Sequence, residues 1–277
     1  MATVMRGSFA DKALNGAAIF WLLTALAGQW AFFVYLVAFY GPTTLSGNFE
    51  AWNRLAALGA RPYEPGDTAG NLAFAAHALG AALVALGGAL QLVPWIRAHA
   101  PAFHRWNGRV FLCTVTALSL SGFYLVWVRL SGTSTLGAVT TTINGVLILV
   151  FAMRTFITAR ARELGAHRRW AMRLYLVSNA QWFTRVGVFG YFVTGSVLGL
   201  RPSFNDPFLT FWSVGCFLVP LLVLEAYVRT KDGSSRAGRF AFAGALGLLT
   251  LVMAAGIVGF GAFSALIVSG KPLAFPG

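Results

Sequence analysis

Seven long apolar stretches constrain this chain more than any other feature of its sequence. They cover about residues 15–40, 72–95, 106–129, 137–159, 170–195, 207–228 and 240–268. A membrane-spanning helix needs about 20 consecutive apolar residues, and each stretch reaches that length. Only 10% of the residues are charged, against about 25% in soluble domains. We therefore predict an all-α polytopic membrane protein, with seven transmembrane helices in a single integral membrane domain over residues 1–277.

The basic residues predict how these helices are oriented. If the N-terminus is cytoplasmic, 14 of the 21 Lys and Arg residues lie on the cytoplasmic side and 5 on the opposite side. Cytoplasmic loops of membrane proteins carry such an excess. We therefore predict an inner-membrane protein with its N-terminus inside and its C-terminus outside. The same distribution accounts for the net charge of +13 without a nucleic-acid partner, and leaves the lipid bilayer as the predicted surroundings.

Two short basic stretches resemble one another. The first runs over residues 97–109 and the second over residues 160–173, and each contains a His, an Arg, a Trp and a further Arg. Each stretch follows one apolar segment and opens the next. The repetition predicts a four-helix core, residues 60–195, made of two similar hairpins. His104 and His167 would then lie at the same depth, in the first turns of two spans.

The residues around these two histidines predict a binding site. The start of a helix exposes free N–H groups and a partial positive charge, which suit an anionic ligand. Two imidazoles also suit a b-type haem, with His104 and His167 as the axial ligands of the iron. The arginines that would pair with haem propionates, an anionic lipid or a small acid are Arg105, Arg109, Arg168, Arg169 and Arg173. The alternative is that these side chains only anchor helix ends in the anionic inner leaflet.

A second polar group is predicted nearer the outer face. Arg185 follows Arg173 by 12 residues, about 18 Å further along a helix. His77, Asn144 and Gln181 fall at a similar depth. An ionisable group inside a membrane is costly and marks a functional site by default. The group predicts either a pocket for a ligand such as a quinone head group or a haem propionate, or an arginine satisfied by its neighbours.

The outer loop over residues 41–71 is the longest polar connection. Residues 49–55 are predicted to form a short helix lying in the membrane interface. The loop is then either a structured cap over the outer face or a plain linker. Small residues recur in the last span at Gly256 and its neighbours, and predict close helix packing.

The polar residues of the core resemble a bacterial family of multi-pass membrane proteins that is catalogued only as a domain of unknown function. The resemblance covers about residues 60–195 and rests on His77, Gln91, Arg97, Pro101, His104–Arg105–Trp106, Gly108–Arg109, His167–Arg168–Arg169–Trp170, Arg173 and Arg185. It implies a helical membrane core and no established activity. A weaker resemblance is to four-helix cytochromes of the b561 type, whose histidine ligands lie within their helices.

The predicted function is haem-linked electron transfer. His104 and His167 are its predicted axial ligands, and His77 with Arg185 forms an outer quinone or second haem site. One alternative is a binder or transporter of an anionic lipid or small acid, and another is an accessory subunit that contacts a partner protein. Glu225 is the only carboxylate placed in a span, which argues against a carboxylate-based proton relay or a di-iron site.

Overall fold

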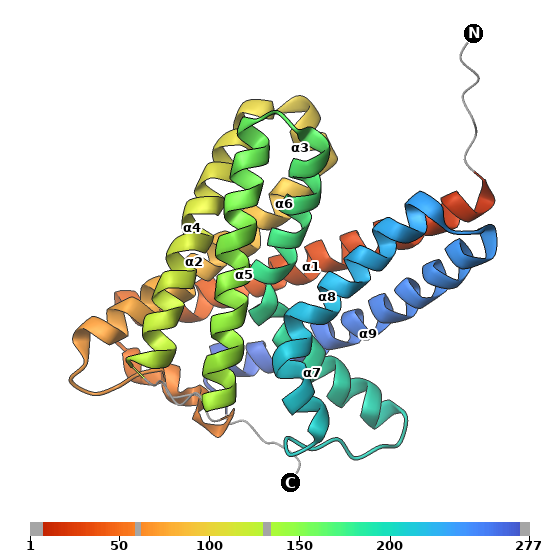
Figure 1. The fold of residues 1–277 in the computed structure, drawn as a ribbon. Helices are drawn as coiled ribbons and strands as arrows, with labels where there is room; N and C mark the ends of the chain where they lie inside the picture. Colours follow the sequence, from red (N-terminus) through yellow and green to blue (C-terminus); the bar gives the residue numbers. More distant parts are fainter. Residues whose placement is uncertain (1–7, 59–61, 130–133, 272–277) are drawn as a thin grey trace. The chain divides into compact units, whose positions relative to one another are not determined.

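The computed structural model describes residues 8–58, 62–129 and 134–271, and these are almost entirely helical (Figure 1). The elements in chain order are α1 (Phe9–Leu45), the 3₁₀ helix η1 (Phe49–Leu58), α2 (Thr68–Leu92), α3 (Pro94–His99), α4 (Pro101–Trp127), α5 (Thr135–Arg160), α6 (Leu164–Ser178), α7 (Ala180–Val197), α8 (Pro207–Gly233) and α9 (Arg236–Ser269).

Six of the described helices are long and apolar enough to cross a membrane, namely α1, α2, α4, α5, α8 and α9. This confirms an all-α polytopic membrane protein. The predicted count of seven spans is not confirmed, because the chain over residues 170–195 forms two helices, α6 and α7. Asn179 separates them with φ −101° and ψ 15°, and its side-chain amide donates to the carbonyl oxygen of Tyr175 at 2.8 Å. Polar Gln181 and Arg185 follow in α7, and α6 begins in the basic stretch.

The chain divides into two compact units. The first comprises Met1–Gly28 with Thr184–Phe260, and the second comprises Gln29–Phe183 with Gly261–Gly277. The boundaries between the units fall inside α1, α7 and α9. The predicted single integral domain stays a prediction.

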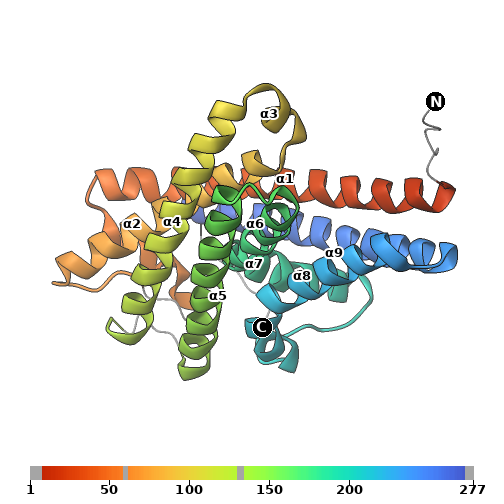
Figure 2. The ribbon, with the colours of Figure 1, turned by 45° about the horizontal axis from the view of Figure 1, so that its top comes forward.

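The centre of the second unit is a bundle of α2, α4, α5 and α6, which we call the four-helix bundle. Consecutive helices pack side by side, α2 against α4, α4 against α5 and α5 against α6 (Figures 1 and 2). Gly88 of α2 lets two other helices approach closely. A Cβ there would lie 2.9 Å from the ring of Phe111 in α4 and 3.2 Å from the ring of Tyr175 in α6. Small residues of α2 therefore bring α4 and α6 onto it.

The outer loop forms a structured cap on the second unit. Trp52 of η1 is completely buried and contacts the rings of Tyr40, Phe49 and Phe74. Its indole N–H donates to the hydroxyl of Thr43 at 2.8 Å. An indole that is buried with its N–H bonded stabilises the cap, so the interpretation of this loop as a plain linker is wrong.

In the first unit, α7 and α9 are in backbone contact. A Cβ at Gly256 of α9 would coincide with the carbonyl oxygen of Val186 in α7, and a Cβ at Gly190 would lie 3.0 Å from the carbonyl oxygen of Val252. The predicted small-residue packing of the last span is thereby confirmed for Gly256. At the start of the same helix, the guanidinium of Arg239 pairs with Asp11 of α1 at 2.6 Å.

Candidate functional site

Both basic stretches lie at one end of the four-helix bundle, which we call the basic end. There α4 begins at Pro101 and α6 begins at Leu164, so that His104 and His167 each occupy the fourth position of a helix. A tight turn connects α5 to α6. The N–H of Glu163 donates to the carbonyl oxygen of Thr158 at 3.0 Å, and Arg162 has a φ of 60°. This is the left-handed helix end that glycine usually occupies.

His167 is oriented by the backbone of the neighbouring helix. Its Nδ1 lies 3.0 Å from the carbonyl oxygen of Thr155 in α5. A carbonyl oxygen only accepts, so Nδ1 carries the proton, and Nε2 of the neutral ring is left with a lone pair. Histidines that ligate metals are commonly held by such a bond from the other ring nitrogen.

His104 has a buried ring nitrogen that nothing in the described chain satisfies. Its backbone carbonyl accepts a hydrogen bond from the side chain of Gln91 at 2.9 Å, but its Nδ1 is buried without a hydrogen-bond partner among the described residues. The groups that act electrostatically on this imidazole are Arg97, Arg105 and, when it is protonated, His167. The two histidines are therefore close enough to interact electrostatically.

Two buried hydroxyls add to the polar atoms in the bundle interior. The hydroxyls of Thr155 and Tyr175 also have no hydrogen-bond partner within the described residues. A buried polar group without a partner costs about 1–3 kcal/mol. An added ligand or water that bonded to these atoms would offset that cost.

The arginines of the basic end stack on tryptophans. The guanidinium of Arg109 lies 4.7 Å from the ring centre of Trp106, and that of Arg173 lies 4.8 Å from the ring centre of Trp170. Both pairs have a spacing of three residues along one helix, which brings the side chains together. The remaining arginines predicted to pair with an anion, Arg105, Arg168 and Arg169, are exposed. Stacks of this kind are typical of the membrane interface.

The structure places the predicted outer group in both units. His77 of α2 bonds through Nδ1 to the hydroxyl of Ser121 in α4 at 2.8 Å. Asn144 of α5 has a buried amide oxygen without a partner among the described residues. Gln181 belongs with them to the second unit, where its side chain is exposed, whereas Arg185 belongs to the first. The predicted proximity of Arg185 to His77 therefore stays a prediction.

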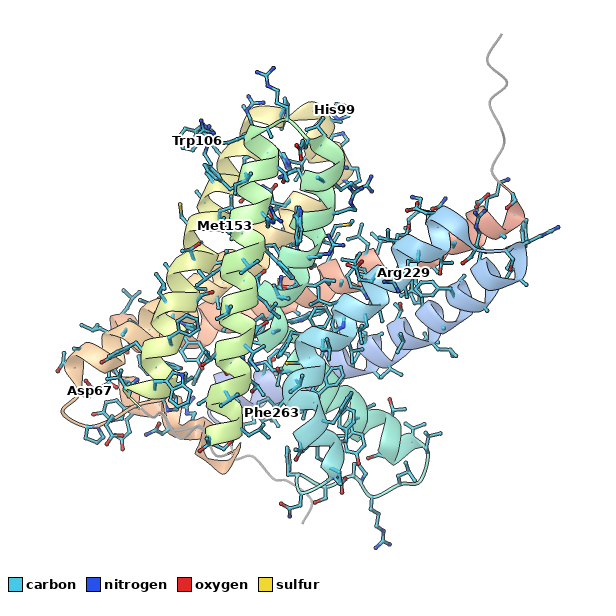
Figure 3. The ribbon with its side chains drawn as sticks, viewed as in Figure 1. Asp67, His99, Trp106, Met153, Arg229 and Phe263 are labelled. Atoms are coloured by element: carbon cyan, nitrogen blue, oxygen red, sulfur yellow. The ribbon has the colours of Figure 1, made fainter. Side chains whose placement is uncertain are left out.

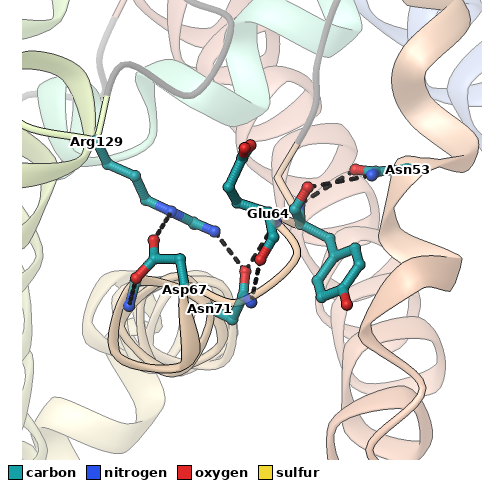
Figure 4. Close-up of polar contacts among 7 residues, drawn as sticks. Asn53, Glu64, Asp67, Asn71 and Arg129 are labelled. Atoms are coloured by element: carbon teal, nitrogen blue, oxygen red, sulfur yellow. Dashed lines mark hydrogen bonds and ion pairs between the residues drawn. The ribbon is translucent and has the colours of Figure 1, made fainter.

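A polar cluster at the opposite end of the bundle was not predicted (Figure 4). Arg129 beyond α4 pairs with Asp67 at 2.9 Å and bonds to Asn71. Asn71 also bonds to the backbone of Glu64, accepting at 3.1 Å and donating at 2.8 Å. The cluster ties the outer cap to α2 and α4. The sequence did carry one signal for this cluster: Asp67 precedes an apolar run, which is the usual position of a helix N-cap.

A family model described as "Predicted membrane protein (DUF2306)" matches residues 74–228, which is more than half of the chain. The predicted resemblance to a membrane-protein family of unknown function is thereby confirmed, whereas a likeness to b561-type cytochromes is not shown. No curated protein and no solved structure matches the chain. Among the described residues there is also no group of three or more His, Cys, Asp or Glu side chains that could hold a metal ion.

Proposed function

This chain belongs to the DUF2306 family of predicted membrane proteins, and from that premise we propose that it binds a haem b between His104 and His167. The observation that carries the proposal is the state of the two imidazoles. Nε2 of His167 is left with a lone pair by the bond from Nδ1 to Thr155, and the buried Nδ1 of His104 lacks a partner within the described chain. A b-type haem can take two histidines as ligands, and helix bundles hold such cofactors between their helices.

Each residue would have a definite task. Thr155 fixes the ring of His167 through its carbonyl oxygen, and Gln91 holds the backbone of His104. Arg97 and Arg105 already act electrostatically on His104 and would pair with propionates. When bound, haem supplies a one-electron redox centre. The function proposed is therefore electron transfer within the membrane.

The experiment is an absorption spectrum of full-length protein purified from haem-supplemented cells, recorded oxidised and after reduction with dithionite. We expect a Soret band and a sharp reduced α-band that are lost in His104→Ala and in His167→Ala. His99→Ala is the matched control, because His99 is an exposed histidine of the same stretch that bonds to the carbonyl oxygen of Trp95. Protein without a Soret band, or a band that survives both substitutions, would refute the proposal.

The second candidate function is binding or transport of an anionic lipid or small acid. The two stacks favour it, since they fix Arg109 on Trp106 and Arg173 on Trp170 near the end of the bundle where lipid phosphates would lie. Mass spectrometry of the purified protein tests it. We expect an anionic lipid in stoichiometric amount in the native protein and its loss when both arginines are replaced by Gln. A native protein that retains no such lipid would rule this function out.

For His77 of the outer group, we infer a contact with a quinone head group. Within the second unit, Nδ1 of His77 bonds to the hydroxyl of Ser121, and in the tautomer that carries its proton on Nε2 the imidazole would donate to a quinone carbonyl. Binding of a short-chain quinone, followed by quenching of tryptophan fluorescence, is expected to weaken in His77→Phe. Equal binding by this variant would assign His77 to helix packing alone.

A further inference from the structure

An apolar groove runs along the surface of the four-helix bundle between α4 and α5. It has a volume of about 590 Å³, and among the side chains that line it are Leu112, Cys113, Thr116, Leu120, Met153 and Phe156. Leu120, Met153 and Phe156 are each at least half exposed. Figure 3 shows Met153 on α5, well below Trp106, which lies at the basic end. Both helices are long and apolar enough to cross the membrane, so the groove faces lipid.

Each wall of the groove is one stripe of a helix, and each stripe ends in an arginine. On α4, the residues Arg109, Leu112, Thr116 and Leu120 follow one another at spacings of three or four residues. They therefore share one face of the helix. On α5 the same spacing runs forward from Met153 to Arg160. Because α4 begins and α5 ends at the basic end, both arginines stand at the same mouth of the groove.

Both guanidinium groups are held at that mouth by aromatic rings. Arg109 lies over Trp106 at 4.7 Å, and Arg160 lies over Phe156 at 5.9 Å. Phe156 is itself part of the groove wall. A guanidinium that is stacked on a ring keeps its N–H groups for a phosphate, which it can bind with two parallel hydrogen bonds.

The length of the groove matches one leaflet. From Leu112 to Leu120 the wall extends over eight residues of α4, about 12 Å at 1.5 Å per residue. One leaflet of the hydrocarbon core is about 15 Å thick. An acyl chain that starts at the basic mouth would therefore lie in this groove over most of the leaflet.

We propose that the groove between α4 and α5 binds an anionic phospholipid, with one acyl chain along the groove and the phosphate on Arg109 and Arg160. The apolar walls and the two positive charges at one mouth complement such a molecule along its length. The inference takes its class of ligand from the second candidate function and assigns that ligand a place. It does not depend on haem.

Cys113 provides a reporter inside the groove. It is exposed, whereas the second cysteine, Cys216, is buried and serves as an internal reference. Full-length protein, freed of lipid in maltoside detergent, is titrated with dioleoyl phosphatidylglycerol or dioleoyl phosphatidylcholine. The rate of Cys113 alkylation by N-ethylmaleimide is then measured by peptide mass spectrometry. We expect the anionic lipid to slow alkylation at concentrations where the zwitterionic lipid has little effect.

Four substitutions sharpen the test. Arg109→Gln and Arg160→Gln are each expected to raise the half-protecting concentration of phosphatidylglycerol about fivefold, the factor for one basic residue at an anionic surface. Arg229→Gln is the charge-matched control, because Arg229 is exposed on α8 (Figure 3) and should leave the protection unchanged. Ala117→Trp adds a large side chain to the groove wall and should abolish protection by either lipid.

Equal protection by both lipids would overturn the proposal, since it would describe ordinary contact with acyl chains. Protection that persists in both arginine variants, or no protection at all, would overturn it as well. These failures are distinguishable from failure of the second candidate function. A lipid that still co-purifies, and is lost in Arg173→Gln but retained in Arg160→Gln, would show binding at the basic end outside this groove.

Discussion

Gly70→Ala is expected to destabilise the protein, although the same exchange usually strengthens a helix. A Cβ at Gly70 would coincide with Oδ2 of Asp67 and lie 2.7 Å from Nε of Arg129. The substitution therefore displaces Asp67, which caps α2 through the N–H of Gly70 at 2.9 Å and also pairs with Arg129 at 2.9 Å. The side chain of Arg129 is 5% exposed and that of Asp67 33%, so the displaced pair would leave a buried charge.

The magnitude follows from three contributions. Alanine in place of glycine favours a helix by about 1 kcal/mol. Loss of the cap costs about 1 kcal/mol. Breaking a fully buried ion pair costs about 3–5 kcal/mol, which we reduce to about 2 kcal/mol because a third of Asp67 is exposed to solvent. The net loss is about 2 kcal/mol, or a fall in melting temperature of about 4 °C for a chain of this size.

The assay is thermal unfolding in detergent, followed by circular dichroism. Gly165→Ala is the matched control, because Gly165 also lies in the first turn of a helix and its added Cβ would meet only Arg169, at 3.9 Å. This variant should be as stable as the native protein or slightly more stable. A double-mutant cycle with Arg129→Gln tests the cause, since Gly70→Ala should cost less where the ion pair is already absent. Strictly additive effects, or a Gly70→Ala protein as stable as the control, would refute the reasoning.

Three further predictions follow from local geometry. Arg162→Gly should raise the free energy of unfolding by about 1 kcal/mol in the same thermal assay. The reason is that Arg162 has a φ of 60°, a conformation that strains any residue with a Cβ. Gly256→Ala should destabilise the protein, because the added Cβ would clash with the backbone oxygen of Val186. The clash should push α7 and α9 apart, so cysteine cross-linking between these two helices should become slower. Hydrogen bonds from the N–H of Ser203 and then from the hydroxyl of Tyr191 hold the pKa of Asp206 below its ordinary 3.8. The ionised carboxylate therefore stabilises the fold above pH 3.8, and this contribution is lost as the pH falls through the folded-state pKa. Asp206→Asn should remove that part of the acid dependence of unfolding.

Hydropathy predicted the membrane fold well because apolar length is a direct requirement of the bilayer. It did not predict the break within residues 170–195, where one apolar run forms the two helices α6 and α7. The break at Asn179 depends on a side chain that bonds to the carbonyl oxygen of Tyr175 instead of continuing the helix. An asparagine at this position is only a weak signal in the sequence, because its local bonds to the backbone compete with a helix without preventing one.

For the site residues as well, the sequence predicted some features and not others. His104 and His167 could be singled out because a rare residue recurs in two similar stretches. Their surroundings could not be predicted, because the groups that orient them are a backbone oxygen of Thr155 and a side chain of Gln91. Ser121 was missed as the partner of His77 for a related reason. A serine in an apolar helix normally bonds to its own backbone, and only the packing of α2 on α4 gives it a second role.

The two basic stretches are alike in one spacing and different in another, and the difference separates their roles. Tryptophan and arginine are three residues apart in both, and both pairs stack at nearly the same distance. From histidine to tryptophan the spacing is two residues in α4 and three in α6, a difference of about 100° around a helix. Trp170 consequently meets α5, where it contacts Phe151 and Arg154.

On α4, Trp106 lies about 200° and Arg109 about 140° around the helix from His104, and Trp106 is 65% exposed. Its arginine therefore stands beside the lipid-facing groove, while the histidine of the same stretch faces the helices of the bundle. In α6 the corresponding tryptophan is taken up in packing against α5. If the four-helix core arose by repetition of a hairpin, a shift of one residue between histidine and tryptophan was enough to give one copy a surface that binds lipid and the other a packing contact. Arg109, and not Arg173, therefore stands at the mouth of the groove.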